Sequence, residues 1–463
     1  MLEDRVETFD AIIVGSGQAG NPLALALAKQ KWKVAIVEKG ALGGTCVNTG
    51  CTPTKAYVAS ARAAWAISNA PNLGIDVPKS PKVSLKAIKK RKDKLVNESR
   101  LGLRKSLADS PQVSMIRGTA TFLDKTRLKV GSRILKSYKI FLNVGARAGV
   151  PEGFEEVDYL TNSSILQLDK IPDHLVIVGG SYIGLEFAQI FKRLGSKVTI
   201  LEMGANLISK EDKDTSEIVR AILENEGIKI ICGAKCLKGK NKKSGGVTVT
   251  FHKDDNDKQV SGSHLLIATG RIPNSDLLKV GKANLEINEK GYIEVNSKLE
   301  TNIEGIYALG DCNGKGAFTH TSYNDYEIME DQLFGEKKRT LDDRIINYAL
   351  YIDPPLGRAG MTLAQAKKSG KKLMFARMPM SEISRAKEKG ETQGKMEVIV
   401  DADSDQILGA AVLGTGGDEI IGTFLTAMYA KLSYKKLMKS VQTHPTVTEL
   451  IPTLLQQLKP VED

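Results

Sequence analysis

Residues 9–38 read FDAIIVGSGQAGNPLALALAKQKWKVAIVE, and this stretch decides the fold of the first part of the chain. An apolar strand runs into a glycine turn, and an alanine-rich helix and a second apolar strand follow. Gly15 allows the tight turn, Gly17 lets backbone approach a pyrophosphate, and Gly20 lets the helix pack closely on the strand. Glu38 ends the second strand, where a carboxylate can bind the two ribose hydroxyls. The stretch therefore predicts a strand–helix–strand unit that binds a dinucleotide.

Residues 175–202, LVIVGGSYIGLEFAQIFKRLGSKVTILE, repeat the same pattern. Gly179 and Gly184 take the first and third glycine positions, and Ser181 replaces the second, which narrows the backbone approach slightly. Glu202 closes the second strand of the repeat. A carboxylate there binds a ribose 2′-hydroxyl and repels a 2′-phosphate, so NADH is favoured over NADPH. Two lysines a few residues further on keep NADPH possible.

Two nucleotide sites in one chain suggest two redox cofactors, and a flavin reduced by a nicotinamide fits that combination. Residues 265–274, LLIATGRIPN, form an apolar strand that ends in a turn at Gly270. Residues 305–312, GIYALGDC, form another that ends at Asp311. An acid after such a turn can accept a hydrogen bond from the ribityl chain of a flavin, although a lone aspartate there is more often part of a simple turn.

A pair of cysteines stands in GGTCVNTGCTPTK, residues 43–55. Cys46 and Cys51 are separated by four residues and lie just before a predicted helix that Cys51 opens. The field of a helix N-terminus lowers the pKa of a thiol and stabilises its thiolate. A metal clip, a structural disulfide and a redox-active pair all remain open from the spacing alone.

Length and composition bound the class of protein. The chain has 463 residues, an apolar fraction of 41% and five cysteines, which predicts several soluble domains and no secreted disulfide framework. It contains no apolar run long enough for a membrane span and no signal peptide, so we expect a cytoplasmic protein without membrane contact. The net charge of +12 gathers partly in residues 79–106. That segment lacks interleaved aromatic residues, so we interpret it as a solvated helix and expect no nucleic-acid partner.

Six motifs occur in an order that resembles the class I pyridine nucleotide-disulfide oxidoreductases from end to end: GSGQAG, GGTCVNTGC, GGSYIGLE, ATGRIPN, YALGDC and HPTVTE. This family includes glutathione reductase, dihydrolipoamide dehydrogenase and mercuric reductase. The local sequence around the motifs is most similar to that of bacterial mercuric reductase-like proteins. The resemblance implies an α/β fold with two Rossmann-like dinucleotide-binding domains, for FAD and NAD(P)H, and an α+β C-terminal dimerisation domain. It also implies a homodimer whose active sites use both chains.

The domain borders that follow carry errors of several residues. We expect four segments: an FAD-binding domain with the redox pair (1–150), an NAD(P)H-binding domain (151–273), a central domain completing the FAD site (274–340) and the dimerisation domain (341–463). The resemblance adds Gly44, Thr45 and Gly145 to the FAD site.

The resemblance also assigns roles to the cysteine pair. Cys51 would be the thiol beside the flavin, and Cys46 the outer thiol that attacks the substrate. Hydride would pass from NADH to FAD and then to the Cys46–Cys51 disulfide, and the released Cys46 thiolate would open a substrate disulfide. Lys55 and Glu186 match the ion pair of the family near flavin and nicotinamide. Tyr182 matches the residue that gates the nicotinamide pocket, although packing alone could also explain it.

His444 stands in THPTVTE, five residues before Glu449. A thiolate leaving group needs a proton, histidine is the side chain suited to supply it, and a carboxylate can hold the ring in one tautomer. The resemblance places this histidine at the cysteine pair of the other subunit. A lone histidine is more often structural. Cys232 and Cys236 have no histidine or further cysteine at ligand spacing, so we expect no metal site and interpret them as packing residues. We expect Cys312, which follows Asp311, to be buried next to the flavin site.

Three functional hypotheses remain. We favour an NADH-dependent disulfide reductase acting on a small disulfide or thiol-linked substrate, with dihydrolipoamide dehydrogenase as an alternative. The second is a mercuric reductase that reduces Hg(II) with Cys46 and Cys51 alone. Against it, the chain ends LLQQLKPVED without a vicinal cysteine pair, and it keeps His444 and Glu449. The third is a flavin-bearing thiol sensor that binds a partner through its basic helix.

Overall fold

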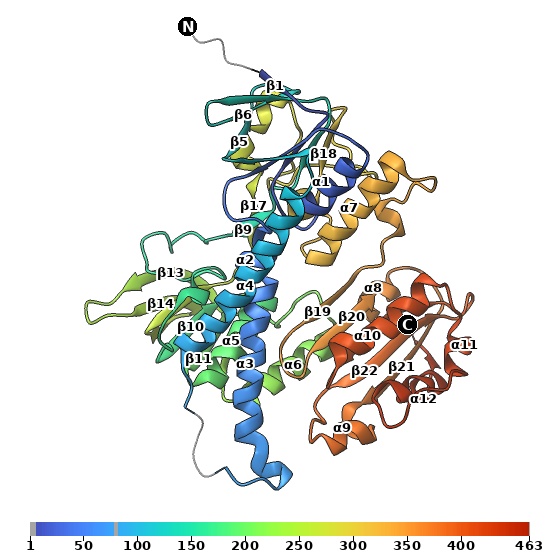
Figure 1. Cartoon of the computed structure of the whole chain (residues 1–463). Helices are drawn as coiled ribbons and strands as arrows, with labels where there is room; N and C mark the ends of the chain where they lie inside the picture. Colours follow the sequence, from blue (N-terminus) through green and yellow to red (C-terminus); the bar gives the residue numbers. More distant parts are fainter. Residues whose placement is uncertain (1–5, 78–81, 463) are drawn as a thin grey trace.

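The computed structural model describes residues 6–77 and 82–462, and Figure 1 shows three blocks of secondary structure connected by long segments. The first block is built on a parallel sheet with strand order β18-β8-β2-β3-β4. Its strands are β2 (Ala11–Val14), β3 (Val34–Glu38), β4 (Val113–Arg117), β8 (Ile140–Leu142) and β18 (Ile306–Ala308). The last strand comes from far along the chain, so the central segment contributes directly to the first sheet.

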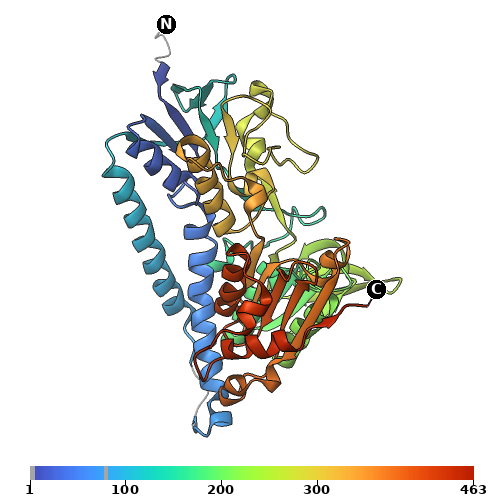
Figure 2. The same ribbon diagram turned by 90° about the vertical axis from the view of Figure 1, so that its right-hand side faces the viewer.

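Helices cover the first sheet on one side, as Figure 2 shows from a second direction. They are α1 (Gly20–Lys29), α4 (Leu85–Ala108) and α7 (Thr319–Phe334). A smaller sheet of order β1-β7-β6-β5 lies beside it. Its strands are β1 (Val6–Thr8), β5 (Ala120–Phe122), β6 (Arg127–Val130) and β7 (Arg133–Lys136).

The second block repeats the parallel plan with strand order β12-β11-β10-β16. Its strands are β10 (His174–Val178), β11 (Lys197–Glu202), β12 (Lys229–Cys232) and β16 (His264–Ile267), with helices α5 (Tyr182–Leu194) and α6 (Lys213–Asn225). An antiparallel sheet joins it, formed by β13 (Lys235–Asn241), β14 (Val247–Lys253) and β15 (Asn256–Gly262). A short pair, β9 (Ala146–Ala148) with β17 (Arg271–Pro273), connects the first and second blocks.

The third block is an antiparallel sheet of order β19-β20-β23-β22-β21-β24. Its strands are β19 (Asn347–Leu350), β20 (Leu356–Gly360), β21 (Leu373–Pro379), β22 (Lys395–Asp401), β23 (Ile407–Leu413) and β24 (Lys459–Pro460). Its helices are α8 (Leu363–Lys367), α9 (Ser384–Glu388), α10 (Gly417–Tyr429), α11 (Tyr434–Met438) and α12 (Ile451–Gln456). The α/β fold with two dinucleotide-binding units and a separate C-terminal α+β unit is confirmed.

Two helices carry the cysteine region. The short helix α2 (Gly44–Asn48) precedes α3 (Cys51–Asn69), which begins at Cys51 as predicted and is followed by the 3-10 turn Ala70–Leu73. α3 packs against α4 and α5, and its buried face joins a core cluster that reaches from the second block to Leu350 and Leu356 of the third. The redox region therefore sits where all three blocks meet.

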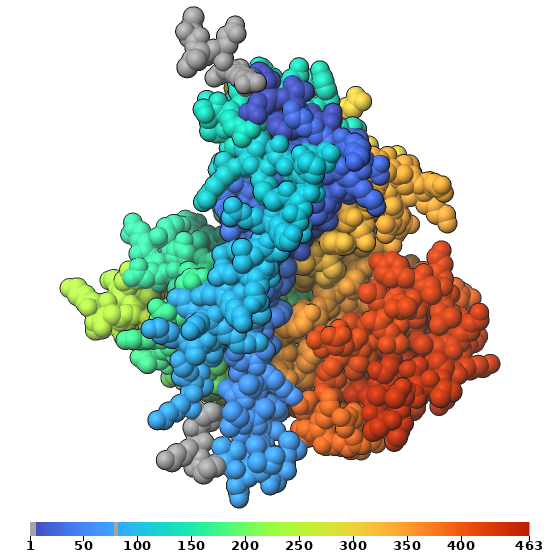
Figure 3. All heavy atoms as spheres, viewed as in Figure 1, coloured from blue at the N-terminus to red at the C-terminus, as the bar shows by residue number. Residues whose placement is uncertain are grey.

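The basic segment forms the amphipathic helix α4, which begins at an N-cap where the Ser84 side chain accepts from the Ala87 amide. Residues 79–81 of that segment lie outside the described residues. In Figure 3, α4 runs along one face of the molecule. Leu85, Val96 and Leu107 are buried as the apolar spacing requires, and the buried side chain of Lys92 is an addition that the pattern did not predict. No helix among the described residues is long and apolar enough to cross a membrane.

Candidate active site

The first glycine turn is shaped so that side chains are excluded from it. Gly15 has φ +107°, and a Cβ there would lie 2.2 Å from the carbonyl oxygen of Asn143. A Cβ on Gly17 would lie 2.5 Å from Oδ1 of Asn143, and one on Gly20 would lie 2.2 Å from the oxygen of Gly15. The Glu38 carboxylate closes the turn by accepting from the Ser16 amide at 2.9 Å. Strand, turn, helix and acid therefore meet as the sequence predicts.

The second glycine turn copies the first. Gly179 has φ +113°, and a Cβ on Gly184 would lie 2.1 Å from the oxygen of Gly179. The Glu202 carboxylate accepts from the amides of Gly180 at 2.5 Å and Gly204 at 2.7 Å. Ser181 is exposed at the N-cap of α5.

Gly180 was not among the predicted residues, yet a Cβ there would lie 2.7 Å from Leu207 and 3.0 Å from Glu202. A glycine at position 180 is therefore required for packing against Leu207 and Glu202. Gly270 has φ +140° and open space around it, so its backbone conformation is what disfavours a side chain there.

A cavity of about 1110 Å³ extends from the first glycine turn to the cysteine pair. This volume slightly exceeds the ~300–1,000 Å³ of ordinary small-molecule sites, as an extended dinucleotide requires. The predicted residues that line it are Gly15, Gly17, Glu38, Gly44, Thr45, Cys46, Cys51, Lys55, Gly145, Tyr182, Glu186 and Asp311. The predicted residues outside its lining are Gly20, Gly179, Ser181, Gly184, Glu202, Gly270, His444 and Glu449.

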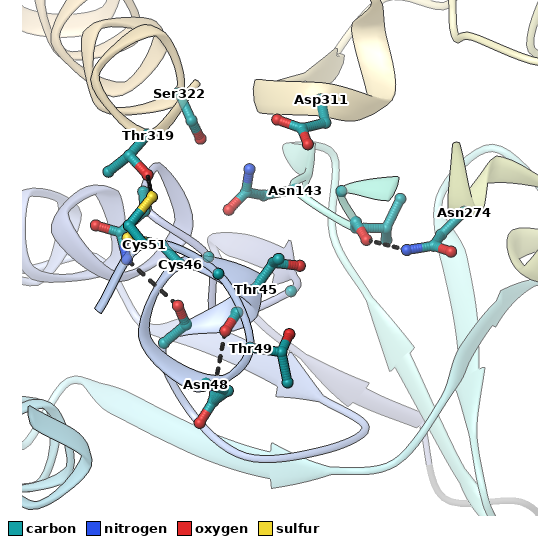
Figure 4. Close-up of a pocket in the computed structure, with 18 of the residues that line it drawn as sticks. Thr45, Cys46, Asn48, Thr49, Cys51, Asn143, Asn274, Asp311, Thr319 and Ser322 are labelled. Carbon is teal, nitrogen blue, oxygen red and sulfur yellow. Dashed lines mark hydrogen bonds between the residues drawn. The ribbon is translucent and has the colours of Figure 1, made fainter. Parts of the chain in front are cut away.

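The two thiols meet in this cavity, as Figure 4 shows. Both are free cysteines: Cys46 comes from α2, and Cys51 begins α3. A hydrogen bond from the Cys46 thiol lowers the pKa of Cys51 to about 6; burial opposes this shift, and Thr319 and the Lys55 charge assist it. The same hydrogen bond, together with burial, raises the pKa of Cys46. The surroundings therefore favour the thiolate on Cys51 and the thiol on Cys46.

Thr319 begins α7 and places its hydroxyl oxygen 3.1 Å from the Cys51 sulfur. The cysteine and the threonine are 268 residues apart in the chain. Cys51 thus lies at the N-terminal ends of two helices, α3 and α7, and both favour a negative charge on its sulfur. Nothing in the local sequence identifies Thr319 as a contact of the cysteine, so sequence reasoning missed it.

The predicted ion pair forms across the block boundary. Lys55 Nζ lies 2.6 Å from Glu186 Oε2, and the carboxylate is nearly buried. The other oxygen of Glu186 accepts from the amide of Tyr351 at 3.0 Å, while the ring of Tyr351 lies 4.3 Å from Lys55 Nζ. Tyr351 comes from the third block and lines the cavity, and no motif marked it in the sequence.

Tyr182 is the first residue of α5 and follows the second glycine turn. Its ring lines the cavity, and its hydroxyl is buried. Phe318 and Tyr348 each meet its ring edge-on, at centroid distances of 6.0 and 5.6 Å. Tyr182 therefore stands between the second glycine turn, which it follows in the chain, and the cavity that it lines.

Asp311, which also lines the cavity, lies 3.3 Å from the Arg271 guanidinium. Burial raises the pKa of Asp311, and Arg271 acts against that shift. Asn143 donates to the carbonyl of Leu309 and accepts from the amide of Gly20, so it ties the first glycine turn to β18. Neither Arg271 nor Asn143 was predicted, although a polar residue directly after the buried strand IFL was a usable signal for Asn143.

His444 and Glu449 form a pair of their own in the third block. His444 Nδ1 lies 2.8 Å from Glu449 Oε2, and the histidine side chain is 79% exposed. Within one chain this pair does not reach the cysteines' cavity. The Glu449 carboxylate thus holds the imidazole of His444 through Nδ1, while most of the ring is exposed to solvent.

Of the other cysteines, Cys312 lies next to this cavity, beside the lining residues Val144, Gly145 and Asp311. Cys232 and Cys312 are buried, and Cys236 is half-buried. Within residues 6–77 and 82–462, no group of three or more His, Cys, Asp or Glu side chains is arranged to hold a metal ion.

Comparison with known proteins agrees with this geometry. Residues 9–325 match the family model described as pyridine nucleotide-disulphide oxidoreductase, and residues 346–455 match the dimerisation domain of the same family. A probable pyridine nucleotide-disulfide oxidoreductase of Escherichia coli, RclA, is 36% identical, with 97% of this chain and 99% of the relative covered. A mercuric reductase of Streptomyces lividans is 31% identical, with coverage of 97% and 96%.

A solved structure is similar over the same length. The Cu(II) complex of the HOCl-induced flavoprotein disulfide reductase RclA from Escherichia coli has a TM-score of 0.86 and 34% identity. The match covers 97% of this chain and 99% of that one. The chain therefore belongs to the pyridine nucleotide-disulfide oxidoreductases and is a flavoprotein enzyme with the dimerisation domain of that family.

Proposed function

We propose that this enzyme reduces a disulfide substrate with electrons from NADH, through a bound FAD and the Cys46–Cys51 pair. The observation that carries the proposal is the combination of a thiol–thiolate pair in the cavity with a separate His444–Glu449 pair whose histidine is exposed. A dithiol can pass two electrons to a disulfide or to a metal ion. A proton donor for a leaving thiolate is useful only in the first case.

The residues present fit FAD. Side chains are sterically excluded at Gly15, Gly17 and Gly20, which leaves room for a pyrophosphate at the N-terminus of α1, and Glu38 stands where a ribose needs its acceptor. Asp311, which also lines the cavity, would accept from the ribityl chain. When bound, FAD supplies the two-electron carrier between a nicotinamide and the thiol pair.

The two cysteines would have different roles in the reaction. Cys46 loses its proton and attacks one sulfur of the substrate, so that a Cys46–substrate disulfide forms and one substrate thiolate leaves. The Cys51 thiolate then attacks the Cys46 sulfur, which closes the Cys46–Cys51 disulfide and releases the second substrate thiolate. The two electrons that the cysteines lose are those that the substrate gains.

His444 of the partner subunit would move the protons in these steps. It takes the proton of Cys46 and returns it to the first leaving thiolate, while Glu449 holds the ring through Nδ1. Exposure of His444 on a domain that matches the dimerisation model supports this arrangement, because the imidazole is free to enter a second copy of the chain.

Lys55 and Glu186 would stabilise charge next to the flavin and the nicotinamide, and Tyr182 would cover the nicotinamide entrance. Glu202 supports NADH as the nucleotide, since a 2′-phosphate would meet a carboxylate already bound to two backbone amides. We place the domain borders near residues 150, 273 and 340, and note that strand pairs cross the first two of them.

A metal ion is a second candidate substrate. The similar RclA structure is described as a Cu(II) complex, and mercuric reductases are among the relatives. The two thiols of this chain, free and adjacent, are soft ligands that suit Hg(II) or copper. The observation that separates the two candidates is His444, which metal reduction would not need.

The test is NADH oxidation by the FAD-loaded protein with oxidised lipoamide, glutathione disulfide, Hg(II) or Cu(II) as acceptor, in wild type, His444→Ala and Cys46→Ser. We expect turnover of a disulfide that falls at least about 100-fold in His444→Ala, the size of effect typical of a lost general acid or base. Turnover of a metal ion alone, unchanged by His444→Ala but abolished by Cys46→Ser, would contradict the disulfide proposal and support the second candidate.

A further inference from the structure

In the C-terminal sheet, one row of residues paired across neighbouring strands places charged side chains at the interface with the second block. Tyr348 of β19 pairs with Arg358 of β20, which pairs with Ala411 of β23, and Ala411 in turn pairs with Glu397 of β22. Residues in one row of a sheet share a face, and the small side chain of Ala411 lets Arg358 reach Glu397 at 3.3 Å across it.

Glu211 from the second block meets this row. Its side chain is fully buried, as are those of Arg358 and Glu397, with exposed fractions of 0, 1 and 2%. Arg358 donates to Glu211 Oε2 at 2.7 Å through Nε, and the hydroxyl of Tyr348 donates to Glu211 Oε1 at 2.7 Å. One buried carboxylate therefore anchors both members of the Tyr348–Arg358 cross-strand pair.

Lys395 and Asp214 extend the same contact. Lys395 Nζ lies 2.7 Å from Asp214 Oδ2 and 2.7 Å from Glu397 Oε2, so the second and third blocks are joined at two points of one ionic cluster. Removing one member of a buried cluster leaves its partners uncompensated, so the cluster resists rearrangement. The position of the Tyr348 ring is thus set by the interface between blocks.

The anchored ring of Tyr348 is one wall around Tyr182. It stacks on Phe318 at 5.5 Å with planes 15° apart, and His320 also stacks on Phe318, at 5.5 Å. Tyr182 stands edge-on to both Phe318 and Tyr348. These edge contacts hold the Tyr182 ring, and its buried hydroxyl also interacts with the side chain of Tyr348.

We propose that Tyr348 is a positioning residue: fastened by Glu211, it holds Tyr182 across the nicotinamide entrance and so sets the cost of opening that entrance. The inference rests on the function proposed above, in which Tyr182 covers the entrance. Loosening Tyr348 lets Tyr182 leave its place more easily. A nucleotide that must displace Tyr182 then binds more tightly, while a nucleotide that ends before Tyr182 is unaffected.

The test compares two probes by titration calorimetry on the FAD-loaded, oxidised protein. NAD⁺ carries the nicotinamide, and ADP-ribose is the same molecule without it. The ratio of their dissociation constants therefore measures how much the nicotinamide contributes to binding, which includes the cost of opening its entrance. We expect Tyr348→Phe, which removes only the hydroxyl, to tighten NAD⁺ about three- to tenfold and to leave ADP-ribose unchanged. Tyr348→Leu, which removes the ring as well, should change the ratio at least as much.

Tyr326→Phe is the matched control. It also deletes a tyrosine hydroxyl that donates to a glutamate, Glu330, at 2.8 Å, but on the surface of α7. A double-mutant cycle with Tyr182→Ala completes the design, since Tyr348→Phe should have no further effect once the gating ring is gone.

The outcomes separate the two proposals. If wild type binds NAD⁺ and the ratio is the same in Tyr348→Phe and Tyr326→Phe, or if Tyr348→Phe weakens NAD⁺, the inference is wrong and the proposed function stands. An equal effect of Tyr348→Phe with and without Tyr182 would also overturn it. If wild type binds neither NAD⁺ nor ADP-ribose, use of NADH fails, and the inference falls with it.

Discussion

The hydrogen bond between Thr319 and Cys51 gives a prediction that can be worked out in numbers. Replacing Thr319 with valine keeps the volume of the side chain but removes the hydroxyl 3.1 Å from the Cys51 sulfur. A hydrogen bond to a charged group contributes about 1.5–3 kcal/mol. Since the cavity is open enough for water to replace part of this, we take the low end. One pKa unit is 1.36 kcal/mol, so the pKa of Cys51 should rise by about one unit.

The sign follows from which form the hydroxyl stabilises. The pKa of Cys51 is about 6 because its thiolate is stabilised, first by Cys46 and also by Thr319. Without the Thr319 hydroxyl the thiolate is less favoured at every pH. The thiolate fraction should then reach one half near pH 7 instead of near pH 6.

The assay is the rate of alkylation of Cys51 by iodoacetamide in the reduced protein between pH 4 and pH 9, with the modified cysteine located by peptide mass spectrometry. Thr319→Ser keeps a hydroxyl and should titrate like wild type. A Thr319→Val profile that overlays both would refute the reasoning, because the contact would then contribute nothing to the thiolate.

Three further predictions follow from the site. Gly17→Ala should lose bound FAD, measured by the flavin absorbance of the purified protein, whereas Gly281→Ala, at a glycine with open space around it, should keep it. Lys55→Met should lower the unfolding free energy by about 1–2 kcal/mol in denaturant melts, which is less than the ~3–5 kcal/mol of a fully buried pair because Lys55 is partly exposed. Lys55→Arg should recover most of the lost stability. Equal stability of Lys55→Met and wild type would mean that Glu186 is stabilised by other groups. Glu202→Ser should lower the preference for NADH over NADPH at least about tenfold in kcat/KM, and an unchanged ratio would show that Glu202 does not read the 2′ position.

The glycine turns were predictable from sequence because their requirements are local. Gly15 and Gly179 are needed at positive φ, and the strands and helices that flank them carry their own apolar patterns. Cys51 at the start of α3 was predictable for the same reason, since the few residues around a helix N-terminus determine where the helix begins. The order of the motifs then identified the family, which the comparisons confirm.

The sequence by itself determined the two dinucleotide folds and the cysteine pair, because each is encoded in one short contiguous stretch, and the order of the motifs along the chain determined the family of the enzyme. Only the tertiary structure decided what surrounds them. Thr319 reaches Cys51 across 268 residues, and Tyr351 and Tyr348 come to the cavity and its gate from a separate sheet. Such contacts arise where three blocks pack together, and a side chain placed by packing leaves no periodic or spacing signal in its own neighbourhood.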